Sequence, residues 1–85
     1  MWYVYVIKSL NSDFRYIGST SNVDRRLDEH NQGKSLSTKH YLPFELEMFI
    51  AVDTENKARV LEKYFKTGSG KAILNKRFLF LEKNL

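Results

Sequence analysis

The chain has 85 residues, which is room for one small domain, and no cysteine, which excludes disulfides and thiolate metal sites. Its hydrophobic content of 42% suffices for a small core. The sequence has no apolar run near the ~20 residues of a membrane span and no signal-peptide layout, so we expect a soluble, cytoplasmic protein. The net charge of +4, with eight basic and three acidic residues from position 54 onward, favours a polyanionic partner, although a solvated helix face has the same pattern.

The first 18 residues predict a β-hairpin. Residues 2–8 are mostly β-branched or aromatic, which is typical of a central strand. Residues 10–13 are Leu-Asn-Ser-Asp, and the polar side chains among them favour a turn because they can bond their own backbone. Residues 14–18 then return as a shorter strand, and the two strands should pair in antiparallel orientation.

Tyrosines recur on both strands of this hairpin. Tyr3 and Tyr5 point to one face because strand side chains alternate, and Tyr16 joins Tyr5 there if Tyr5 lies opposite Tyr16 or Gly18. A register shifted by one residue would separate the rings. Two adjacent phenols can share a proton and position a water molecule, but a tyrosine pair in a sheet more often serves packing, so both interpretations stay open.

Residues 23–31 predict the first helix. Residues 19–22 offer several N-caps, and Gly33 is the candidate C-terminal stop. Arg26 and His30 are four residues apart and share a helix face next to the apolar stripe. An arginine there can hold a phosphate through two parallel N–H bonds, and a histidine can contact phosphate or relay a proton. A solvated arginine and a half-buried histidine are the plainer alternative.

The middle of the chain predicts a loop and a strand. Residues 32–42 are polar and aperiodic, and so long a loop in a small domain is usually functional or mobile. It carries Lys34, Lys39 and His40, which are candidate nucleic-acid contacts. A proline then opens a third strand over residues 44–52, where apolar and polar residues partly alternate.

The C-terminal third predicts two helices and an apolar tail. Thr54, or the aspartate before it, caps a long helix that runs to about Thr67, where Gly68-Ser69-Gly70 should break it. A shorter helix follows over roughly residues 71–77. The tail, Phe78-Leu79-Phe80-Leu81, is apolar and can be a helix end, a strand or an interface.

One acidic residue interrupts the apolar stripe of the long helix. Ala58, Leu61 and Phe65 recur at helical spacing, and Glu62 lies on the same stripe. A carboxylate among core-facing residues is costly unless something pairs with it. Mg²⁺, which often binds through one or two carboxylates and several waters, is one such partner. A salt bridge to an arginine is an equal alternative on spacing alone.

The element order β-β-α-β-α-α predicts an α+β fold, a single small domain over residues 1–85 in which a three-stranded antiparallel sheet is flanked by helices. On that fold, separate elements supply two phenols, an arginine, a histidine and an inward carboxylate. Such a set can position a water, bind a phosphate and hold one metal ion, which is what phosphodiester hydrolysis requires.

Two tripeptides point to a family with this chemistry. Residues 3–5, Tyr-Val-Tyr, and residues 16–18, Tyr-Ile-Gly, resemble the paired signatures of the GIY-YIG endonucleases. The second tripeptide matches in full, and the first keeps the final tyrosine but has Tyr and Val where the family has Gly and Ile. Segments 18–31 and 61–70 continue the resemblance at the expected spacing, so it spans nearly the whole chain and is greatest with the short free-standing bacterial members. The resemblance implies a GIY-YIG-like fold.

The resemblance also implies a role for each residue singled out above. Tyr5 would be the general base that activates water, and Tyr16 would assist it or hold the nucleophile. Arg26 would stabilise the charge that develops on phosphate, and His30 would contact the phosphate. Glu62 would bind one divalent ion, Mg²⁺ or Mn²⁺. Together these roles describe a metal-dependent endonuclease.

The resemblance and the basic charge predict a nucleic-acid substrate, with DNA favoured over RNA and shape favoured over base sequence. We expect a monomer or weak homodimer that does not contact membranes. The candidate nucleic-acid contacts are Lys34, Lys39, His40, Lys63, Lys66 and Lys71. The main alternative is a non-catalytic module that stacks bases on sheet aromatics. An interaction domain that dimerises through its tail and an inactive relative of the enzymes are two others.

Overall fold

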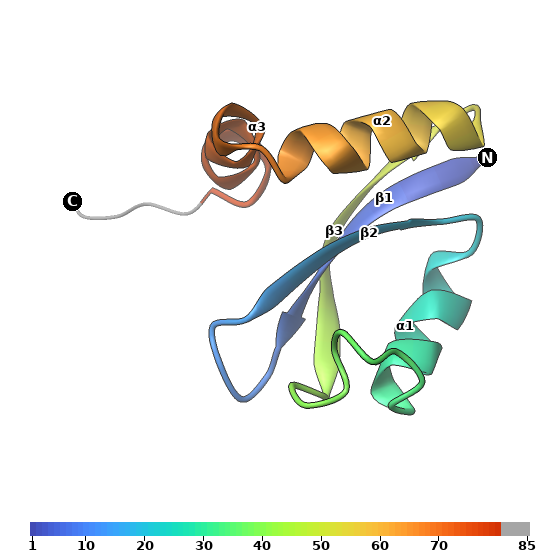
Figure 1. The fold of residues 1–85 in the computed structure, drawn as a ribbon, viewed down its shortest axis with the longest axis vertical. Helices are drawn as coiled ribbons and strands as arrows, with labels where there is room; N and C mark the ends of the chain where they lie inside the picture. The colour runs from blue at the N-terminus through green and yellow to red at the C-terminus, as the bar shows by residue number, and fades with distance from the viewer. Residues whose placement is uncertain (81–85) are drawn as a thin grey trace.

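The computed structural model describes residues 1–80 and confirms the predicted α+β fold. Its strands are β1 (Trp2–Ser9), β2 (Arg15–Thr20) and β3 (Phe44–Val52), which form an antiparallel sheet in the order β2-β1-β3. The helical segments are α1 (Val23–Asn31), α2 (Glu55–Phe65), α3 (Gly68–Ile73) and the π-helical η1 (Leu74–Phe78). Strand β1 is therefore central, and β2 and β3 are the edges of the sheet (Figure 1).

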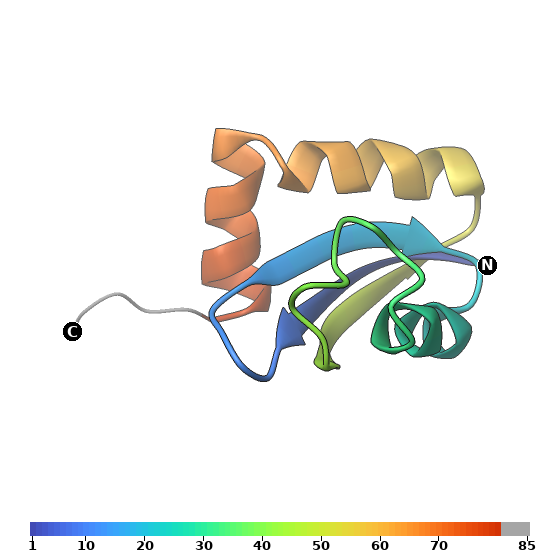
Figure 2. The same ribbon diagram turned by 60° about the horizontal axis from the view of Figure 1, so that its bottom comes forward.

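Helices lie on both faces of the sheet (Figure 2). Strand β1 contributes side chains to two hydrophobic cores, because its side chains alternate between the two faces of the sheet. Val4 and Val6 pack with the buried residues of α2 and η1, whereas Tyr5 and Ile7 pack on the opposite face, where Leu27 of α1 joins them. The side chains of β1 thus reach both layers, and any site at the sheet can draw on α1 and α2 together.

The hairpin register brings Tyr5 and Tyr16, one tyrosine from each signature tripeptide, to one face of the sheet. Tyr5 lies opposite Gly18, and Ile7 lies opposite Tyr16. The rings of Tyr5 and Tyr16 are diagonal neighbours, with centroids 6.3 Å apart. Gly18 makes room for this pair, because a Cβ at its position would lie 2.5 Å from the Tyr5 hydroxyl oxygen. The prediction that Tyr5 and Tyr16 share a face is confirmed.

The ends of α1 and α2 follow the predicted cap chemistry. Asn22 caps α1 by accepting a hydrogen bond from the Arg25 amide at 3.0 Å, and Thr54 caps α2 by accepting from the Lys57 amide at 3.2 Å. Gly33, just beyond α1, has φ +77°, the left-handed conformation that commonly ends a helix. The predicted bounds of α1 and β3 agree with the structure.

The predicted helix break at the Gly-Ser-Gly segment is wrong. Helix α2 ends at Phe65, but α3 begins on the first of these glycines, after Thr67 caps it. The second glycine, Gly70, serves close packing, because a Cβ there would overlap the carbonyl oxygen of Tyr64. The helix predicted over residues 71–77 therefore begins too late, and its second half takes the wider turns of η1.

The apolar tail joins the core only in part. Leu79 packs against the core that lies under α2, whereas Phe78 is 41% exposed and Phe80 is 76% exposed. Leu81 lies outside the described residues, so the dimer contact suggested for the tail stays a prediction. Within residues 1–80, no helix combines the length and the apolar composition that crossing a membrane requires.

Candidate active site

The phenol of Tyr5 begins a buried hydrogen-bond chain. Its hydroxyl oxygen lies 2.9 Å from Nε2 of His30, and Nδ1 of the same ring lies 2.7 Å from Oγ1 of Thr38. His30 and Thr38 are 0% exposed, and Tyr5 is 2% exposed. The last turn of α1 supplies the histidine, and the following loop supplies the threonine. His30 thus presents no surface for the expected phosphate contact, and its hydrogen bonds direct it toward Tyr5.

Burial sets the charge state of this chain. It raises the pKa of Tyr5 to about 12; the Arg26 guanidinium opposes this shift, and the charges of Tyr16 and Glu62 add to it. Burial also lowers the pKa of His30 to about 4, and the charge of Arg26 acts in the same direction. At neutral pH, Tyr5 is therefore a neutral phenol and His30 is a neutral imidazole with a single N–H.

Arg26 reaches the same phenol from α1. Its charge acts on the Tyr5 phenol, and its Nη1 forms an ion pair with Glu29 at 3.0 Å. Burial alone would lower its pKa, but the bonds to Glu29 and Tyr5 outweigh burial and raise it. The side chain is still 31% exposed, so part of the guanidinium remains open to solvent. A cation that is held on one side and open on the other is suited to bind a phosphate.

Glu62 approaches from α2. Its carboxylate accepts a hydrogen bond from the Ser19 hydroxyl at 2.7 Å and pairs with Lys66 at 2.9 Å. The Glu62 side chain is 22% exposed, so the carboxylate is open to a ligand from solvent. The salt bridge weighed as an alternative to metal is present, with a lysine of the same helix in place of an arginine. Lys66 also lies over the ring of Tyr16, 5.6 Å from its centroid.

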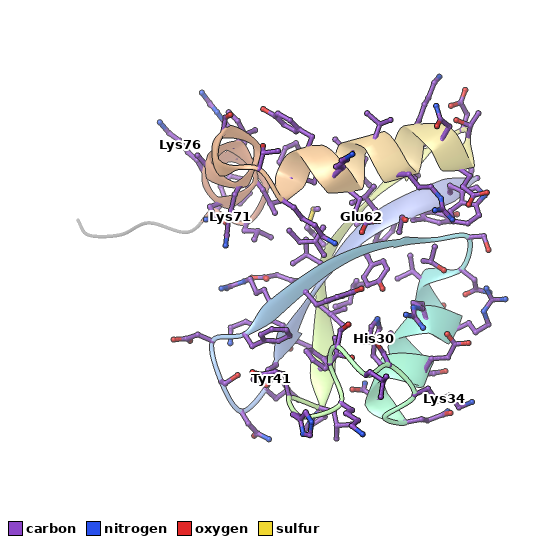
Figure 3. All side chains as sticks on the ribbon, viewed as in Figure 1. His30, Lys34, Tyr41, Glu62, Lys71 and Lys76 are labelled. Atoms are coloured by element: carbon purple, nitrogen blue, oxygen red, sulfur yellow. The ribbon has the colours of Figure 1, made fainter. Side chains whose placement is uncertain are left out.

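The four residues expected to carry the chemistry meet at the edge strand β2. Tyr5 and Tyr16 come from β1 and β2, Arg26 from α1 and Glu62 from α2. The charges of Tyr16, Arg26 and Glu62 all act on the pKa of Tyr5, and the rings of Tyr5 and Tyr16 lie 6.3 Å apart. Figure 3 shows Glu62 and His30 on opposite sides of the β2 ribbon. A small anion bound at this edge would have a phenol, a guanidinium and a carboxylate within its surroundings.

This donor set is compatible with one divalent ion. Within residues 1–80, no three carboxylate or imidazole groups cluster closely enough for an all-protein metal site. Mg²⁺ does not need one, because it commonly takes one or two carboxylates and completes its shell with water and substrate phosphate. Ser19 uses one lone pair of the Glu62 carboxylate, and Lys66, at 48% side-chain exposure, is free to move aside. Glu62 therefore fits Mg²⁺ or Mn²⁺ bound together with substrate.

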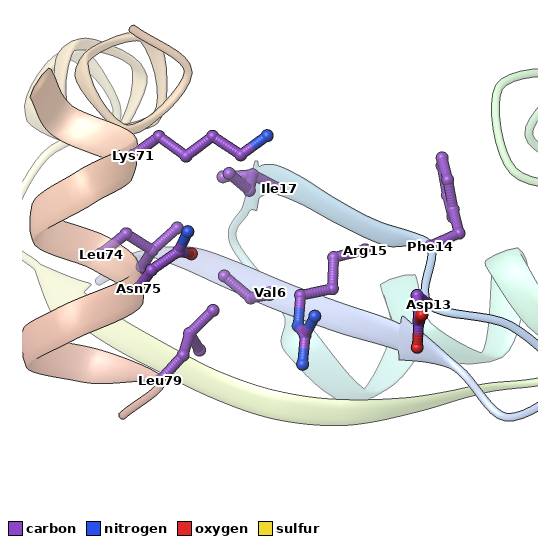
Figure 4. A pocket seen from close by; sticks show the side chains of 9 residues that line it. All are labelled: Val6, Asp13, Phe14, Arg15, Ile17, Lys71, Leu74, Asn75 and Leu79. Carbon is purple, nitrogen blue, oxygen red and sulfur yellow. The ribbon is translucent and has the colours of Figure 1, made fainter. Parts of the chain in front are cut away.

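Two adjoining cavities continue from this site along β2. The nearer one, of about 270 Å³, has Tyr16 and Lys66 in its wall, and the farther one, of about 380 Å³, lies between the hairpin and the α3–η1 segment (Figure 4). Lys71 lines both cavities. Arg15 lines both as well, but its charge is engaged by Glu47, whose carboxylate lies 2.6 Å from Nε and 3.1 Å from an Nη nitrogen. Among the described residues that line these cavities, Lys71 is thus the cation without an ion pair, and Lys66 shares its charge with the partly exposed Glu62.

The candidate nucleic-acid contacts form two groups on either side of β2. Lys63 and Lys66 on α2 and Lys71 on α3 form one group, and the residues of the loop after α1 form the other, as the labelled Lys71 and Lys34 illustrate (Figure 3). All six residues, Lys34, Lys39, His40, Lys63, Lys66 and Lys71, are exposed. In the part of the chain that the structure describes, Lys66 is the one member of the set that forms an ion pair.

Sequence reasoning missed two residues that orient the site. Thr38 holds His30, and Ser19 holds Glu62. Ser19 follows the second signature tripeptide on a strand, so alternation with Gly18 could have placed it on the face that α2 covers. Thr38 lies in an aperiodic loop, where no sequence period indicates which side chain turns inward.

Comparisons with known proteins show the family to which the chain belongs. A family described as the GIY-YIG catalytic domain matches residues 1–77. A UPF0213 protein of Bacillus licheniformis is 36% identical over 70 residues, which cover 81% of this chain and 71% of that protein. No solved structure matches the chain. The family match includes every strand and helix on which the candidate site is built.

Proposed function

The chain belongs to the GIY-YIG family of nuclease domains, and on that premise we propose that it is a metal-dependent endonuclease that hydrolyses phosphodiester bonds in DNA. The observation that supports the proposal is that Tyr5, Tyr16, Arg26 and Glu62 lie along strand β2, with the buried Tyr5 beside the partly exposed Arg26 and Glu62. These groups supply a base, a phosphate-binding cation and a metal ligand. A cytoplasmic location is part of the proposal, because the substrate is intracellular DNA.

In the proposed reaction, Tyr5 takes a proton from the attacking water. Because its pKa is about 12, the phenolate is scarce at neutral pH, and the rate depends on how well neighbouring donors stabilise that anion. Arg26 stabilises it directly, and its open side binds a phosphate oxygen as charge develops there. Tyr16 holds the water beside Tyr5. Glu62, oriented by Ser19, holds the divalent ion, which supplies Lewis-acid stabilisation of the phosphate when bound.

The proposed path of the DNA follows β2. Lys63, Lys66 and Lys71 would contact phosphates on one side of the site, and the loop cations Lys34 and Lys39 on the other. The cavity of about 270 Å³ beside Tyr16 and the adjoining one of about 380 Å³ are close to the size of small-molecule sites, so they suit single unpaired nucleotides. This size favours DNA with unpaired nucleotides near the cleaved bond, such as the flapped and branched structures that arise in DNA repair.

The base-stacking alternative requires aromatic rings on an open sheet face. Here helices lie on both faces of the sheet, and Tyr5 is only 2% exposed (Figure 2). A stacking platform also has no use for a carboxylate that a strand serine orients toward the site edge, as Ser19 orients Glu62. These observations favour the nuclease over the stacking module.

A cleavage panel tests the proposal. The full chain is incubated with single-stranded, nicked, flapped and branched DNA, and with matched RNA, in Mg²⁺, in Mn²⁺ or in EDTA. We expect cleavage of at least one DNA that carries unpaired nucleotides, and no cleavage in EDTA. Binding is followed in parallel by fluorescence anisotropy. Binding without cleavage of any substrate would support the non-catalytic module, and cleavage in EDTA would remove the metal role.

A pair of glutamate variants on α2 localises the metal requirement. Glu62→Gln removes the proposed ligand charge and should lower the cleavage rate roughly 10²–10³-fold. Glu55→Gln is the matched control, because Glu55 lies on the same helix and pairs only with the exposed Arg59 among the described residues. It should retain the wild-type rate. A Glu62→Gln enzyme that cleaves as fast as the Glu55→Gln enzyme would contradict the assignment of Glu62.

A further inference from the structure

The imidazole of His30 is fully enclosed, and its two nitrogens meet two hydroxyl groups. The rings of Tyr5, Tyr16 and Phe44 surround it, with centroids 5.9, 5.2 and 6.1 Å away. Its polar contacts are the Tyr5 hydroxyl at Nε2 and the Thr38 hydroxyl at Nδ1. The ring is neutral near pH 7, since burial lowers its pKa to about 4. A neutral imidazole has one N–H, so one nitrogen must donate and the other must accept.

The surroundings of Thr38 decide between the two tautomers. Within residues 1–80, the hydrogen-bond partner of its hydroxyl is Nδ1 of His30 and nothing else. If Nδ1 carried the ring proton and donated to Thr38, the buried hydroxyl proton of Thr38 would have no acceptor. If Thr38 donates to Nδ1, the ring proton lies on Nε2 and points at the Tyr5 oxygen, and each of these protons has an acceptor. An unpaired buried donor disfavours the first arrangement roughly tenfold or more.

The Tyr5 hydroxyl can accommodate the second arrangement better than the Thr38 hydroxyl can accommodate the first, because Tyr5 keeps 2% exposure whereas Thr38 has none. The Arg26 side chain beside it is 31% exposed, so solvent reaches this edge. With the His30 N–H at its oxygen, the Tyr5 proton is left for the edge of the site where Arg26 lies. In this arrangement the phenol oxygen accepts from His30, and its own proton is the one left for solvent.

We propose that Thr38 is a positioning residue whose hydroxyl fixes His30 as the Nε2–H tautomer, so that His30 donates to Tyr5 and does not take its proton. The catalytic consequence rests on the proposed nuclease function. The Tyr5 O–H bond breaks and its proton goes to solvent, and the phenolate, held by His30 and Arg26, then takes a proton from the water that bonds to phosphorus. The leaving oxygen takes a proton from solvent, which completes the hydrolysis.

The tautomer is measured directly in the free full-length chain. Long-range ¹H–¹⁵N spectra of the histidine-labelled protein distinguish a bare ring nitrogen from a protonated one. The chain has two histidines, and the His40→Gln variant identifies the signals of the exposed one. Near pH 7 we expect a bare Nδ1 and a protonated Nε2 for His30. The opposite tautomer in the wild-type protein would overturn the proposal, whatever the behaviour of any variant.

Two substitutions then test the cause. Thr38→Val keeps the shape of the side chain without its hydroxyl, and Thr38→Ser keeps the hydroxyl. In Thr38→Val the ratio of the Nε2–H to the Nδ1–H form should fall about tenfold or more, whereas Thr38→Ser should retain the wild-type ratio. On the best substrate of the cleavage panel, kcat should fall about tenfold in Thr38→Val with little change in KM, and recover in Thr38→Ser. A folded Thr38→Val protein with the wild-type ratio would show that another group fixes the ring.

The spectra and the cleavage assay separate the two proposals. A wild-type chain that cleaves nothing but has the Nε2–H tautomer would end the proposed function and support the role of Thr38 in orienting His30. A wild-type chain that cleaves DNA with the Nδ1–H tautomer would keep the nuclease and end the role proposed for Thr38.

Discussion

The two halves of the proposed site are built in different ways. On the α1 side, Tyr5, His30 and Thr38 form a hydrogen-bond chain in which no residue is more than 2% exposed. On the α2 side, the side chains of Glu62 and Lys66 are 22% and 48% exposed and hold each other by an ion pair. The first half is fixed by packing, whereas the second half can exchange its partners when a charged ligand arrives.

This difference matches what each half must do. A general base works best when its orientation and its donors are set before substrate binds, because no reorganisation is then needed during the reaction. A phosphate and a divalent ion must enter from solvent, so the groups that meet them have to stay reachable. The buried half accordingly uses neutral hydroxyls and an imidazole, and the open half uses full charges, which are costly to bury. We expect substitutions in the two halves to change different measurable quantities.

The largest effect should come from the hydroxyl of Tyr5. Tyr5→Phe keeps the ring in its core, removes the proposed base and leaves Nε2 of His30 without its partner. The value of kcat should fall about 10²–10⁴-fold. Because the pKa of Tyr5 is about 12, far above neutrality, the wild-type rate should rise with pH as the phenolate fraction grows, and the residual activity of the variant should not.

Tyr3→Phe is the matched control for that experiment. Tyr3 lies on the same strand and face, and its ring packs against Phe49 with centroids 5.7 Å apart. This variant should keep both the wild-type kcat and the rise with pH. A Tyr5→Phe enzyme with the kcat and pH profile of Tyr3→Phe would exclude Tyr5 as the base.

The next largest effect should come from the arginine that links the two halves. Arg26→Ala removes the positive charge that acts on Tyr5 and the proposed phosphate-binding surface, so kcat/KM should fall about 10²–10³-fold. Arg25→Ala is the control, because Arg25 is also near Glu29, at 3.9 Å, but is 60% exposed. Its kcat/KM should stay near the wild-type value. Equal losses in both variants would mean that net charge, and not the geometry of Arg26, determines the rate.

The open half of the site was more predictable from sequence than the buried half. Helical spacing placed Glu62 on the inner stripe of α2, and strand alternation predicted that Tyr16 shares the face of Tyr5 in one of the two possible registers, because both follow from a backbone period. The choice of Arg26 over its neighbour came from family resemblance. The metal and substrate roles of these residues are proposals that the Glu62→Gln, Tyr5→Phe and Arg26→Ala variants test.

The buried half depends on contacts that no period encodes. The spacing of α1 put His30 beside the apolar stripe, but its full burial comes from Phe44 and from the loop that brings Thr38 over the ring. The role of Gly70 was predicted wrongly for a related reason. A glycine can mark a helix break, as predicted, or it can allow a close approach to a carbonyl, as Gly70 does with Tyr64, and the sequence does not distinguish the two. Long-range packing decides both cases, and composition does not.

Acid should lower the free energy of unfolding through the protonation of His30, an effect smaller than those on catalysis above and larger than that of Lys66 below. The pKa of His30 is about 4 in the folded chain and about 6.5 when unfolded, so the unfolded state binds more protons between those values. The free energy of unfolding should therefore fall by about 2–3 kcal/mol as pH drops from about 6.5 to about 4, and this contribution should level off below. Urea titrations across this range measure it.

Two histidine variants assign this acid response. His40→Gln removes the exposed histidine and should leave the pH dependence of unfolding intact. His30→Gln should be less stable at pH 7 but should lose this part of the pH dependence. If His40→Gln flattens the curve and His30→Gln does not, the acid response comes from the surface and the buried chain of Tyr5, His30 and Thr38 is not its source.

The smallest effect should come from Lys66, and it tests whether the open half exchanges partners. The ion pair with Glu62 is partly exposed, so Lys66→Met should change the free energy of unfolding by no more than about 0.5 kcal/mol. Because the lysine and the divalent ion compete for one carboxylate, the Mg²⁺ concentration for half-maximal cleavage should fall about twofold.

Lys63→Met, on the same helix, removes the same charge without touching Glu62 among the described contacts. Both variants should weaken DNA binding by about one phosphate contact in the salt dependence, so a lower Mg²⁺ requirement in Lys66→Met alone isolates the exchange at Glu62. An unchanged requirement in both would mean that Lys66 does not compete with the metal, and that the open half is as fixed as the buried one.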